Sequence, residues 1–250
     1  MSFDHENMQI IQCVDSTNNY AMALIKKGKI SHGNSFFAME QTHGKGRRGK
    51  EWKSNKGDNV ILSIVSEMQW LPVSQQFHLS VAVALSCYDL ITKYILANVS
   101  IKWPNDLFIN DSKTGGILIE NVIKGTLWQW SVIGIGLNIN QESFDQFNLT
   151  ATSFKLQNGK DFNVVNLAEE LVEIVLKRIA DLEAGAFSKM LEEYNQKLYA
   201  KNKMVKLKKD NEIFQTKVIG VSAAGQLITK DAFERRFNFD EVEFKGLVDE

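Results

Sequence analysis

The sequence from Gln41 to Trp52, QTHGKGRRGKEW, is the stretch around which the rest of the chain can be interpreted. Six lysines or arginines and one acidic residue lie between Lys45 and Lys56, whereas the whole chain has 29 basic and 30 acidic residues and a formal net charge of -1. The positive charge is therefore concentrated in this segment. Glycines let backbone N–H groups approach an anion, and arginines bind phosphate or carboxylate with paired hydrogen bonds. The segment is typical of an anion-binding loop, although a solvated basic loop or a nucleic-acid contact has the same composition.

The composition is that of a globular protein. The chain has 250 residues, of which 44% are hydrophobic and 24% charged, and this length suits either one large core or a core with a small satellite domain. The first eight residues contain no apolar run and no apolar stretch reaches about 18 residues, so we expect a soluble, cytoplasmic protein. Cys13 and Cys87 lie in apolar stretches, which predicts buried free thiols, and the four histidines form no zinc pattern.

Short strands and two helices are predicted for the N-terminal half. Strands are expected at residues 9–14, 35–40 and 59–65. The clearest helix is expected at residues 75–94, where apolar residues recur at helical spacing. The run Asp15-Ser16-Thr17-Asn18 contains the residue types that begin a helix, which Gly28 then ends. Because the first N–H groups of a helix have no partners within it, this run can also bind the polar head of a ligand.

The centre of the chain is predicted to form a hairpin that contains a proline. In KWPND, residues 102–106, Pro104 favours an extended conformation for the preceding Trp103. A turn at residues 110–112 then places Lys113 at the start of the second arm. On its own, Lys113 is best explained as an exposed turn lysine.

Paired or interspersed glycines mark two neighbouring strands. Gly115 and Gly116 follow Lys113, and Gly134 and Gly136 interrupt the strand predicted at residues 127–139. Glycines inside strands indicate a bulge or the close approach of another group.

The C-terminal part changes from helices to short strands near residue 200. Residues 144–160 are expected to form a surface loop, and helices are expected at residues 164–182 and 187–199. Short strands are then expected at residues 204–207, 213–221, 226–229, 235–239 and 242–244. They predict a small β-barrel or meander that packs on the main domain, because so few residues make too small a core.

Four stretches together resemble the catalytic core of biotin protein ligases. They are residues 15–18, the GKGRRGKEW loop, KWPND with Lys113 eleven residues after Lys102, and GIGLNIN at residues 134–140. The resemblance covers nearly the whole chain. It implies an α+β fold with a mixed, mostly antiparallel sheet packed with helices, the class II synthetase-like ligase core. The implied domains are a biotin/lipoate ligase catalytic domain, residues 1–200, and a small C-terminal β-barrel domain, residues 201–250.

The chain departs from the family pattern in two places. Family members that double as repressors carry an N-terminal helix-turn-helix, whereas here the catalytic motifs begin by Asp15, so the resemblance implies a ligase without operator binding. The family loop commonly reads GRGRRGR, and Lys45 and Lys50 stand here in place of arginines. The positive charge is kept at both positions, but lysine lacks the planar guanidinium group that binds phosphate with two parallel hydrogen bonds.

The resemblance implies ATP-dependent biotinylation in two steps. Biotin and ATP form biotinyl-5′-AMP with Mg²⁺, and a lysine of a biotin carboxyl carrier domain of a biotin-dependent carboxylase then takes the biotinyl group. No nucleic-acid or membrane partner is expected, and the protein is expected to be a monomer or a homodimer. The magnesium ligand is left open between Asn105 and Asp106.

Site residues are carried over from the family motifs onto matching positions. The implied catalytic residues are Lys113, as the cation between the carboxylate and the α-phosphate, and Arg47 on the phosphate. The implied biotin-binding residues are Ser16, Thr17, Asn18, Gln41, Gly44, Lys45, Gly46, Arg47, Lys113, Gly115 and Gly116. The implied nucleotide-binding residues are Arg47, Arg48, Lys50, Trp52, Asn105 and Asn138.

Two alternatives stay open at this point. Lipoate protein ligases share the fold and the adenylate chemistry, although KWPND with the basic loop favours biotin. A nucleic-acid-binding module is suggested by a second basic run at residues 201–209. That run lacks the interleaved aromatic residues on which single-stranded bases stack, so a solvated strand face is the preferred interpretation.

Overall fold

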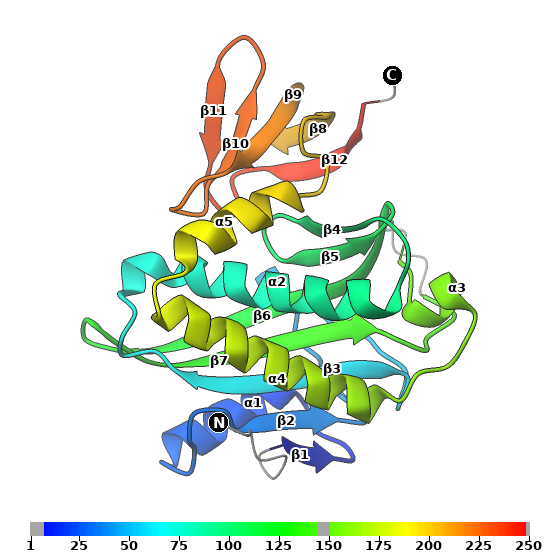
Figure 1. The fold of residues 1–250 in the computed structure, drawn as a ribbon, viewed down its shortest axis with the longest axis vertical. Helices are drawn as coiled ribbons and strands as arrows, with labels where there is room; N and C mark the ends of the chain where they lie inside the picture. The colour runs from blue at the N-terminus through cyan, green and yellow to red at the C-terminus, as the bar shows by residue number, and fades with distance from the viewer. Residues whose placement is uncertain (1–7, 145–150, 249–250) are drawn as a thin grey trace.

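The main body of the protein is a seven-stranded mixed sheet (Figure 1). The computed structural model describes residues 8–144 and 151–248. The strand order is β1-β2-β3-β7-β6-β5-β4, and every neighbouring pair is antiparallel except β1 with β2. The strands are β1 (Met8–Ile11), β2 (Ser35–Ala38), β3 (Asn59–Glu67), β4 (Val99–Lys102), β5 (Asp106–Ile109), β6 (Ser112–Lys124) and β7 (Leu127–Asn138). The α+β fold with a mostly antiparallel sheet is thus confirmed.

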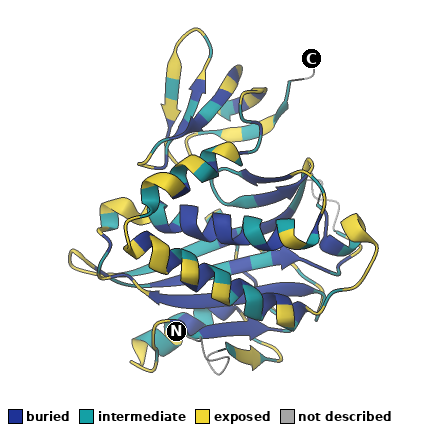
Figure 2. Ribbon diagram, viewed as in Figure 1, coloured by how far each residue is buried: buried dark blue, intermediate teal, exposed yellow. Residues whose placement is uncertain are grey.

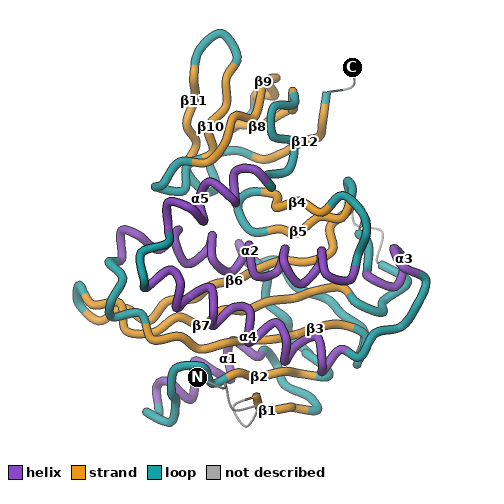
Figure 3. Tube along the Cα trace, in the orientation of Figure 1, coloured by secondary structure: helices purple, strands orange, loops and turns teal. Residues whose placement is uncertain are grey.

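Helices cover the two faces of this sheet unequally. The long helices α2 (Gln76–Tyr94) and α4 (Val164–Glu183) lie side by side across one face (Figures 1 and 3). In β3, Ile64 belongs to the core beneath these helices, whereas the next residue, Val65, packs with the short helix α1 (Thr17–Lys26) on the other face. Because α1 is only 10 residues long, it covers only part of that second face.

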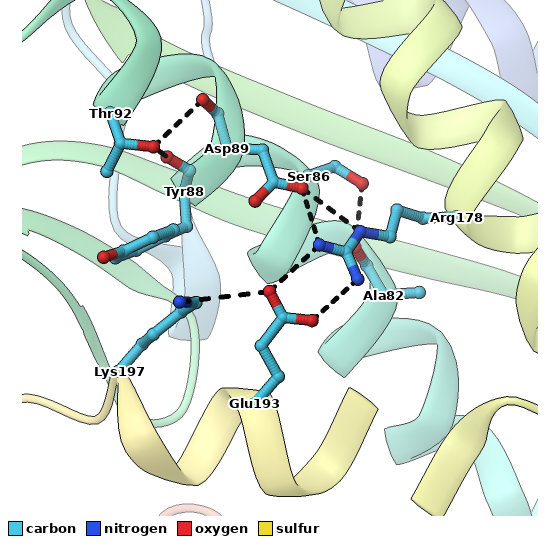
Figure 4. A network of polar contacts seen from close by, with 8 residues as sticks. All are labelled: Ala82, Ser86, Tyr88, Asp89, Thr92, Arg178, Glu193 and Lys197. Carbon is cyan, nitrogen blue, oxygen red and sulfur yellow. Dashed lines mark hydrogen bonds and ion pairs between the residues drawn. The ribbon is translucent and has the colours of Figure 1, made fainter. Parts of the chain in front are cut away.

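A charged cluster fastens the helical layer together. Arg178 of α4 donates to Asp89 of α2, with Nη2 2.7 Å from Oδ2. It also donates to Glu193 of α5 (Phe187–Gln196), with Nη1 2.9 Å from Oε2 (Figure 4). The Arg178 side chain is 19% exposed, so one largely buried guanidinium joins three helices.

The C-terminal residues form a separate five-stranded antiparallel sheet beside the main one (Figure 1). Its strands are β8 (Met204–Lys209), β9 (Glu212–Val221), β10 (Leu227–Lys230), β11 (Glu234–Phe237) and β12 (Glu243–Leu247). The order is β11-β10-β9-β8-β12, so β8 to β11 form a meander and β12 pairs with β8, which agrees with the expected small C-terminal β-domain. Leu207, Val218 and Phe237 share the core of the main body, which confirms the expected packing. Figure 2 shows buried, intermediate and exposed residues mixed along the strands of this sheet.

Several local expectations were wrong. Residues 154–158 were expected in a surface loop but form α3 (Phe154–Asn158), because Ser153 caps the turn and Phe154 is fully buried. Cys13 is exposed, since β1 ends at Ile11, while Cys87 is buried as expected. The helix expected to reach residue 199 ends at Gln196.

Two short 3-10 turns, Arg47–Gly49 and Val73–Gln75, complete the described elements. Among residues 8–144 and 151–248, none of the helices combines the length and the apolar character that a membrane span requires.

Candidate active site

One row of residues crosses five strands of the main sheet on the face where α1 packs. The register places Ile61, Gly136, Gly116, Asp106 and Lys102 opposite one another in β3, β7, β6, β5 and β4. Residues opposed in this way present their side chains on the same face, and neighbouring strands lie about 4.8 Å apart, so the row is about 19 Å long. A cleft of about 1520 Å³ lies over it, and all five residues line the cleft.

Short polar side chains gather at the β3 end of the row. Thr17 donates from its backbone N–H to Gln41 Oε1 over 2.8 Å. Ser63 Oγ lies 2.7 Å from Thr17 Oγ1 and 2.6 Å from Asn18 Oδ1. Thr17, Asn18 and Ser63 are buried, and Ser16 beside them is 1% exposed. These groups form a pocket that can hydrogen-bond a small polar head while excluding water.

The glycines of β7 make room for this pocket and for Trp52. A Cβ atom on Gly134 would lie 2.5 Å from Asn18 Oδ1, and one on Gly136 would lie 2.5 Å from Trp52 Cε2. Neither distance is possible for real atoms, so both positions need glycine for close approach. The expectation of a close approach at this strand is confirmed.

If the pocket binds biotin, as the sequence resemblance implies, Gly134→Ala should weaken that binding by about 10-fold or more, because the added methyl displaces Asn18 from its pocket. Gly125→Ala is the matched control. Gly125 has a φ of 61° in the β6–β7 turn and nothing within 4 Å of a Cβ, so this change costs stability through backbone strain alone. Calorimetric titration with biotin and a thermal melt of both variants separate the two effects. Equal biotin affinity in the two variants contradicts the role of Gly134.

Lys113 stands over the middle of the row. Its Nζ lies 2.6 Å from Asp106 Oδ1 and 5.8 Å from the centre of the Trp52 ring. Gly116 lies beneath it, since a Cβ there would be 3.5 Å from Nζ. The Lys113 side chain is 25% exposed, so the amine is held in place while still open to the cleft.

The basic loop brings two arginines to the same cleft. Arg47 Nη1 donates to Asn105 Oδ1 over 3.2 Å, and Arg47 Nη2 lies 3.3 Å from Asp240 Oδ1. Arg48 Nε lies 2.6 Å from that same Asp240 oxygen. Asp240 belongs to the turn between β11 and β12, so the C-terminal sheet contacts the loop directly.

Glu120 of β6 fastens the loop at its other end. Asn18 Nδ2 donates to Glu120 Oε2 over 2.7 Å, and Lys45 Nζ lies 3.6 Å from Oε1. Asn18 therefore has its oxygen facing Ser63 and its amide facing Glu120.

All but two of the predicted site residues line the cleft. Those that do are Ser16, Thr17, Asn18, Gln41, Lys45, Gly46, Arg47, Arg48, Lys50, Trp52, Asn105, Lys113, Gly116 and Asn138. Gly44 instead packs on the carbonyl of Trp52, and Gly115 packs on Leu137, on the opposite face from its neighbour Gly116. Contact of these two glycines with biotin stays a prediction. The roles of the other residues stay predictions.

Four further residues of the site were missed from the sequence. Ser63 had a signal, because it is a polar residue inside the apolar run NVILSIV of β3. Glu120 and Asp240 had none, since only the tertiary fold brings them to Asn18 and the arginines. Lys102 was noted only as the first residue of KWPND.

The described residues contain no cluster of three or more His, Cys, Asp or Glu side chains that could hold a metal ion. Magnesium bound with a nucleotide needs no such cluster, because phosphates and water provide most ligands and one or two carboxylates complete the set. Asp106 lies at the row and fits that role, whereas Asn105 Oδ1 already accepts from Arg47.

Comparison with known proteins identifies the class to which this fold and cleft belong. The model of the Biotin/lipoate A/B protein ligase family matches residues 10–138, just over half of the chain. The chain belongs to this family. The matched segment contains α1, the basic loop, Lys113 and the glycines of β7.

Particular relatives extend this result. The chain is 34% identical over 136 residues to the bifunctional ligase/repressor BirA of Salmonella typhimurium, which is 54% of this chain and 42% of that protein. It is 31% identical over 137 residues to the biotin–[acetyl-CoA-carboxylase] ligase of Mycobacterium tuberculosis, which is 54% of this chain and 50% of that protein. The chain thus spans about half of these two relatives or less.

A solved structure shares the fold over almost the full length. The biotin protein ligase of Aquifex aeolicus, in complex with biotin and ATP, superposes with a TM-score of 0.82 and 22% identity. The match covers 96% of this chain and 99% of that one, so it includes both sheets.

Proposed function

We propose that this protein is a biotin–[acetyl-CoA-carboxylase] ligase, which attaches biotin to a lysine of a biotin carboxyl carrier domain through biotinyl-5′-AMP. The observation that supports the proposal most strongly is the row of residues across the main sheet, which has the buried polar pocket at one end and Lys113 and Arg47 beside its middle. The pocket suits the neutral, polar ureido head of biotin, and Lys113 lies where the carboxylate at the other end of biotin would meet the nucleotide. The names of the relatives and the biotin and ATP in the Aquifex aeolicus complex support the same reaction.

In the first step the biotin carboxylate attacks the α-phosphorus of ATP, a P–O bond forms, and the bond to pyrophosphate breaks. Two anions must approach each other, and negative charge spreads over the phosphoryl oxygens. Lys113 and Arg47 supply positive charge at fixed positions, which stabilises that charge without reorganisation. When Lys113 contacts the substrates it exchanges its ion pair with Asp106 for one with the carboxylate and phosphate.

In the second step the acceptor lysine, in its neutral form, attacks the acyl carbon of biotinyl-5′-AMP. The amide C–N bond forms, the C–O bond to AMP breaks, and the amine loses its extra proton. Arg47 and Lys113 hold the AMP phosphate as it leaves. The acceptor lysine would reach the adenylate through the opening of the cleft that the main sheet, the basic loop and the C-terminal sheet line.

Magnesium would be held by phosphate oxygens and water, with Asp106 as the fitting carboxylate, and it would neutralise polyphosphate charge. We further propose that the protein is cytoplasmic, that it is a monomer or a homodimer, and that its domains divide at residue 200. No nucleic-acid partner is part of the proposal.

The proposed reaction is tested by incubating the protein with biotin, ATP and Mg²⁺ and analysing the products by mass spectrometry. We expect biotinyl-5′-AMP when all three are present and none when ATP is omitted. Lipoate replaces biotin in a parallel reaction, and preferential formation of lipoyl-AMP would support the lipoate ligase alternative. Failure to form either adenylate removes the proposal.

The basic loop is expected to become ordered over the adenylate. Its three glycines make an open loop entropically favourable, and closure would shield the acyl phosphate from water. We predict that amide exchange across residues 44–52 slows by about 10-fold or more when biotinyl-5′-AMP is added, as followed by mass spectrometry. The β8–β9 turn at residues 210–211, outside the cleft, is the internal control. Equal exchange in the loop with and without the adenylate contradicts closure.

A further inference from the structure

Lys102 is a second lysine of the cleft, and its surroundings differ from those of Lys113. Its Nζ faces three aromatic rings, with the centroids of Phe244, Phe108 and Tyr199 at 4.4, 4.7 and 5.9 Å. No carboxylate within the described part of the chain forms an ion pair with it, although Asp106 is its cross-strand neighbour. Asp106 turns instead to Lys113, at 2.6 Å.

The three rings around Lys102, those of Phe108, Tyr199 and Phe244, form a cage that is held together by contacts between the rings. Tyr199 packs on Phe108 at 5.0 Å and on Phe244 at 5.6 Å, and its hydroxyl donates to Asp111 over 2.9 Å. Phe108 is on β5, Tyr199 follows α5, and Phe244 is on β12 of the C-terminal sheet. Three parts of the chain thus shield one amine. Burial lowers the pKa of Lys102, Asp106 raises it, and Lys113 and Lys50 lower it further.

Cation–π contacts offset part of the cost of removing an ammonium group from water, but they do not neutralise its charge. A half-buried cation that no described carboxylate pairs with, on the wall of a cleft that Lys113 and Arg47 also line, is therefore available to a ligand. It attracts an anion more strongly than an exposed lysine does, because less water screens the interaction.

The position of Lys102 in the row indicates which part of the ligand it meets. The polar pocket lies at the β3 end, Lys113 stands over Gly116 and Asp106, and Lys102 is one strand further, about 4.8 Å beyond Asp106. A ligand with its head in the pocket and its reacting phosphate at Lys113 would extend its remaining phosphates toward Lys102.

We infer that Lys102, within its cage of Phe108, Tyr199 and Phe244, binds the outer phosphates of the nucleotide and holds pyrophosphate as it leaves. The inference rests on the proposed function for the order of groups along the cleft. Lys113 and Arg47 bind the α-phosphate, which stays in the adenylate, whereas Lys102 binds the β- and γ-phosphates, which leave as pyrophosphate. The C-terminal sheet contributes by shielding this amine through Phe244.

The test is calorimetric titration of Lys102→Met with inorganic pyrophosphate in the presence of Mg²⁺. Methionine fits an aromatic cage and removes only the charge. We expect pyrophosphate to bind about 10- to 100-fold more weakly, as for the loss of one charge-assisted contact, and the KM for ATP to rise similarly. Affinity for biotinyl-5′-AMP, which lacks the outer phosphates, should change by less than about twofold by the same reasoning.

Two further variants complete the test. Lys102→Arg keeps a cation in the cage and should retain more pyrophosphate binding than Lys102→Met. Lys197→Met is the matched control, because Lys197 Nζ also faces a ring, Tyr88 at 4.4 Å, but lies outside the cleft lining. Unchanged pyrophosphate affinity in folded Lys102→Met, or an equal loss in Lys197→Met, overturns the inference. If Lys102→Met does not fold, wild type is compared with Lys102→Arg instead. Identical pyrophosphate affinity and identical KM for ATP in these two proteins overturn the inference.

The pyrophosphate titration needs no biotin, so its outcome is distinguishable from that of the proposed function. Wild-type protein that binds pyrophosphate through Lys102 but forms no biotinyl-5′-AMP would contradict the proposed function alone. Wild-type protein that makes the adenylate but binds pyrophosphate independently of Lys102 would contradict this inference alone.

Discussion

Lys113→Ala should leave the protein folded and reduce biotinyl-5′-AMP formation by about 10³-fold, the scale of loss found when one group that stabilises transition-state charge is removed. Lys113 is the cation nearest the middle of the row, and its partner Asp106 cannot replace it. Its removal also leaves a carboxylate facing the incoming anions, which adds repulsion to the lost attraction. Pyrophosphate release from ATP and biotin, measured in a single turnover, gives the rate directly.

Two comparisons make this result specific. Lys124→Ala, an exposed lysine at the far end of the same strand β6, should retain the wild-type rate. The double variant Lys113→Ala with Asp106→Asn should recover part of the lost rate if repulsion by Asp106 contributes. A Lys113→Ala rate within about threefold of wild type would exclude Lys113 from transition-state stabilisation.

Arg178→Met should destabilise the protein by about 2–3 kcal/mol, because the change leaves Asp89 and Glu193 close together without the cation between them. This loss of stability is smaller than the one expected for a fully buried ion pair, because Asp89 is 35% exposed and Glu193 is 26% exposed. Urea unfolding at pH 7 measures the loss. Arg236→Met is the control, since Arg236 is 53% exposed and pairs with Glu234, two residues before it, and it should cost less than about 0.5 kcal/mol.

The effect of Arg178→Met on stability should also depend on pH. The hydrogen bond from Arg178, against the opposing effect of burial, lowers the pKa of Glu193 in the folded protein. A carboxyl group with a lowered folded-state pKa stabilises the protein above its unfolded pKa of about 4.3, and this stabilisation is lost as the pH falls through the folded pKa. The difference in free energy of unfolding between wild type and Arg178→Met should therefore shrink below about pH 4. If the difference in free energy of unfolding between wild type and Arg178→Met stays constant from pH 7 to pH 3.5, Arg178 does not lower the pKa of Glu193.

The sequence predicted elements well where a periodic apolar pattern decides them. The helix at residues 75–94 and the strands around residues 59 and 127 were found because their apolar residues are buried, as helical spacing in the first and as apolar runs in the strands. It failed at residues 154–158, where the hydroxyl of Ser153 and the burial of one ring, Phe154, form a helix too short to show a period. The small C-terminal β-domain was predicted, but short strands do not reveal the order in which they pair.

The site was predicted in part for a similar reason. Ser16, Thr17, Gln41 and Lys113 stand in contiguous motifs, so a local pattern names them. The partners that fix them come from far along the chain: Glu120 lies 102 residues from Asn18, and Asp240 lies 193 residues from Arg47. Local sequence contains no signal for such pairs. The difference between Gly115 and Gly116 also needed the register, because adjacent strand residues face opposite sides of a sheet.

Asp240 and Phe244 lie more than forty residues beyond the helical layer, yet one touches the loop arginines and the other the Lys102 amine. An exchange of the small sheet between related ligases would therefore transplant two groups that belong to the nucleotide end of the cleft. Chimeras joined near residue 200 should inherit their handling of ATP from both parents. In a set of aligned family sequences, substitutions at positions 240 and 244 should accompany those at positions 48 and 102.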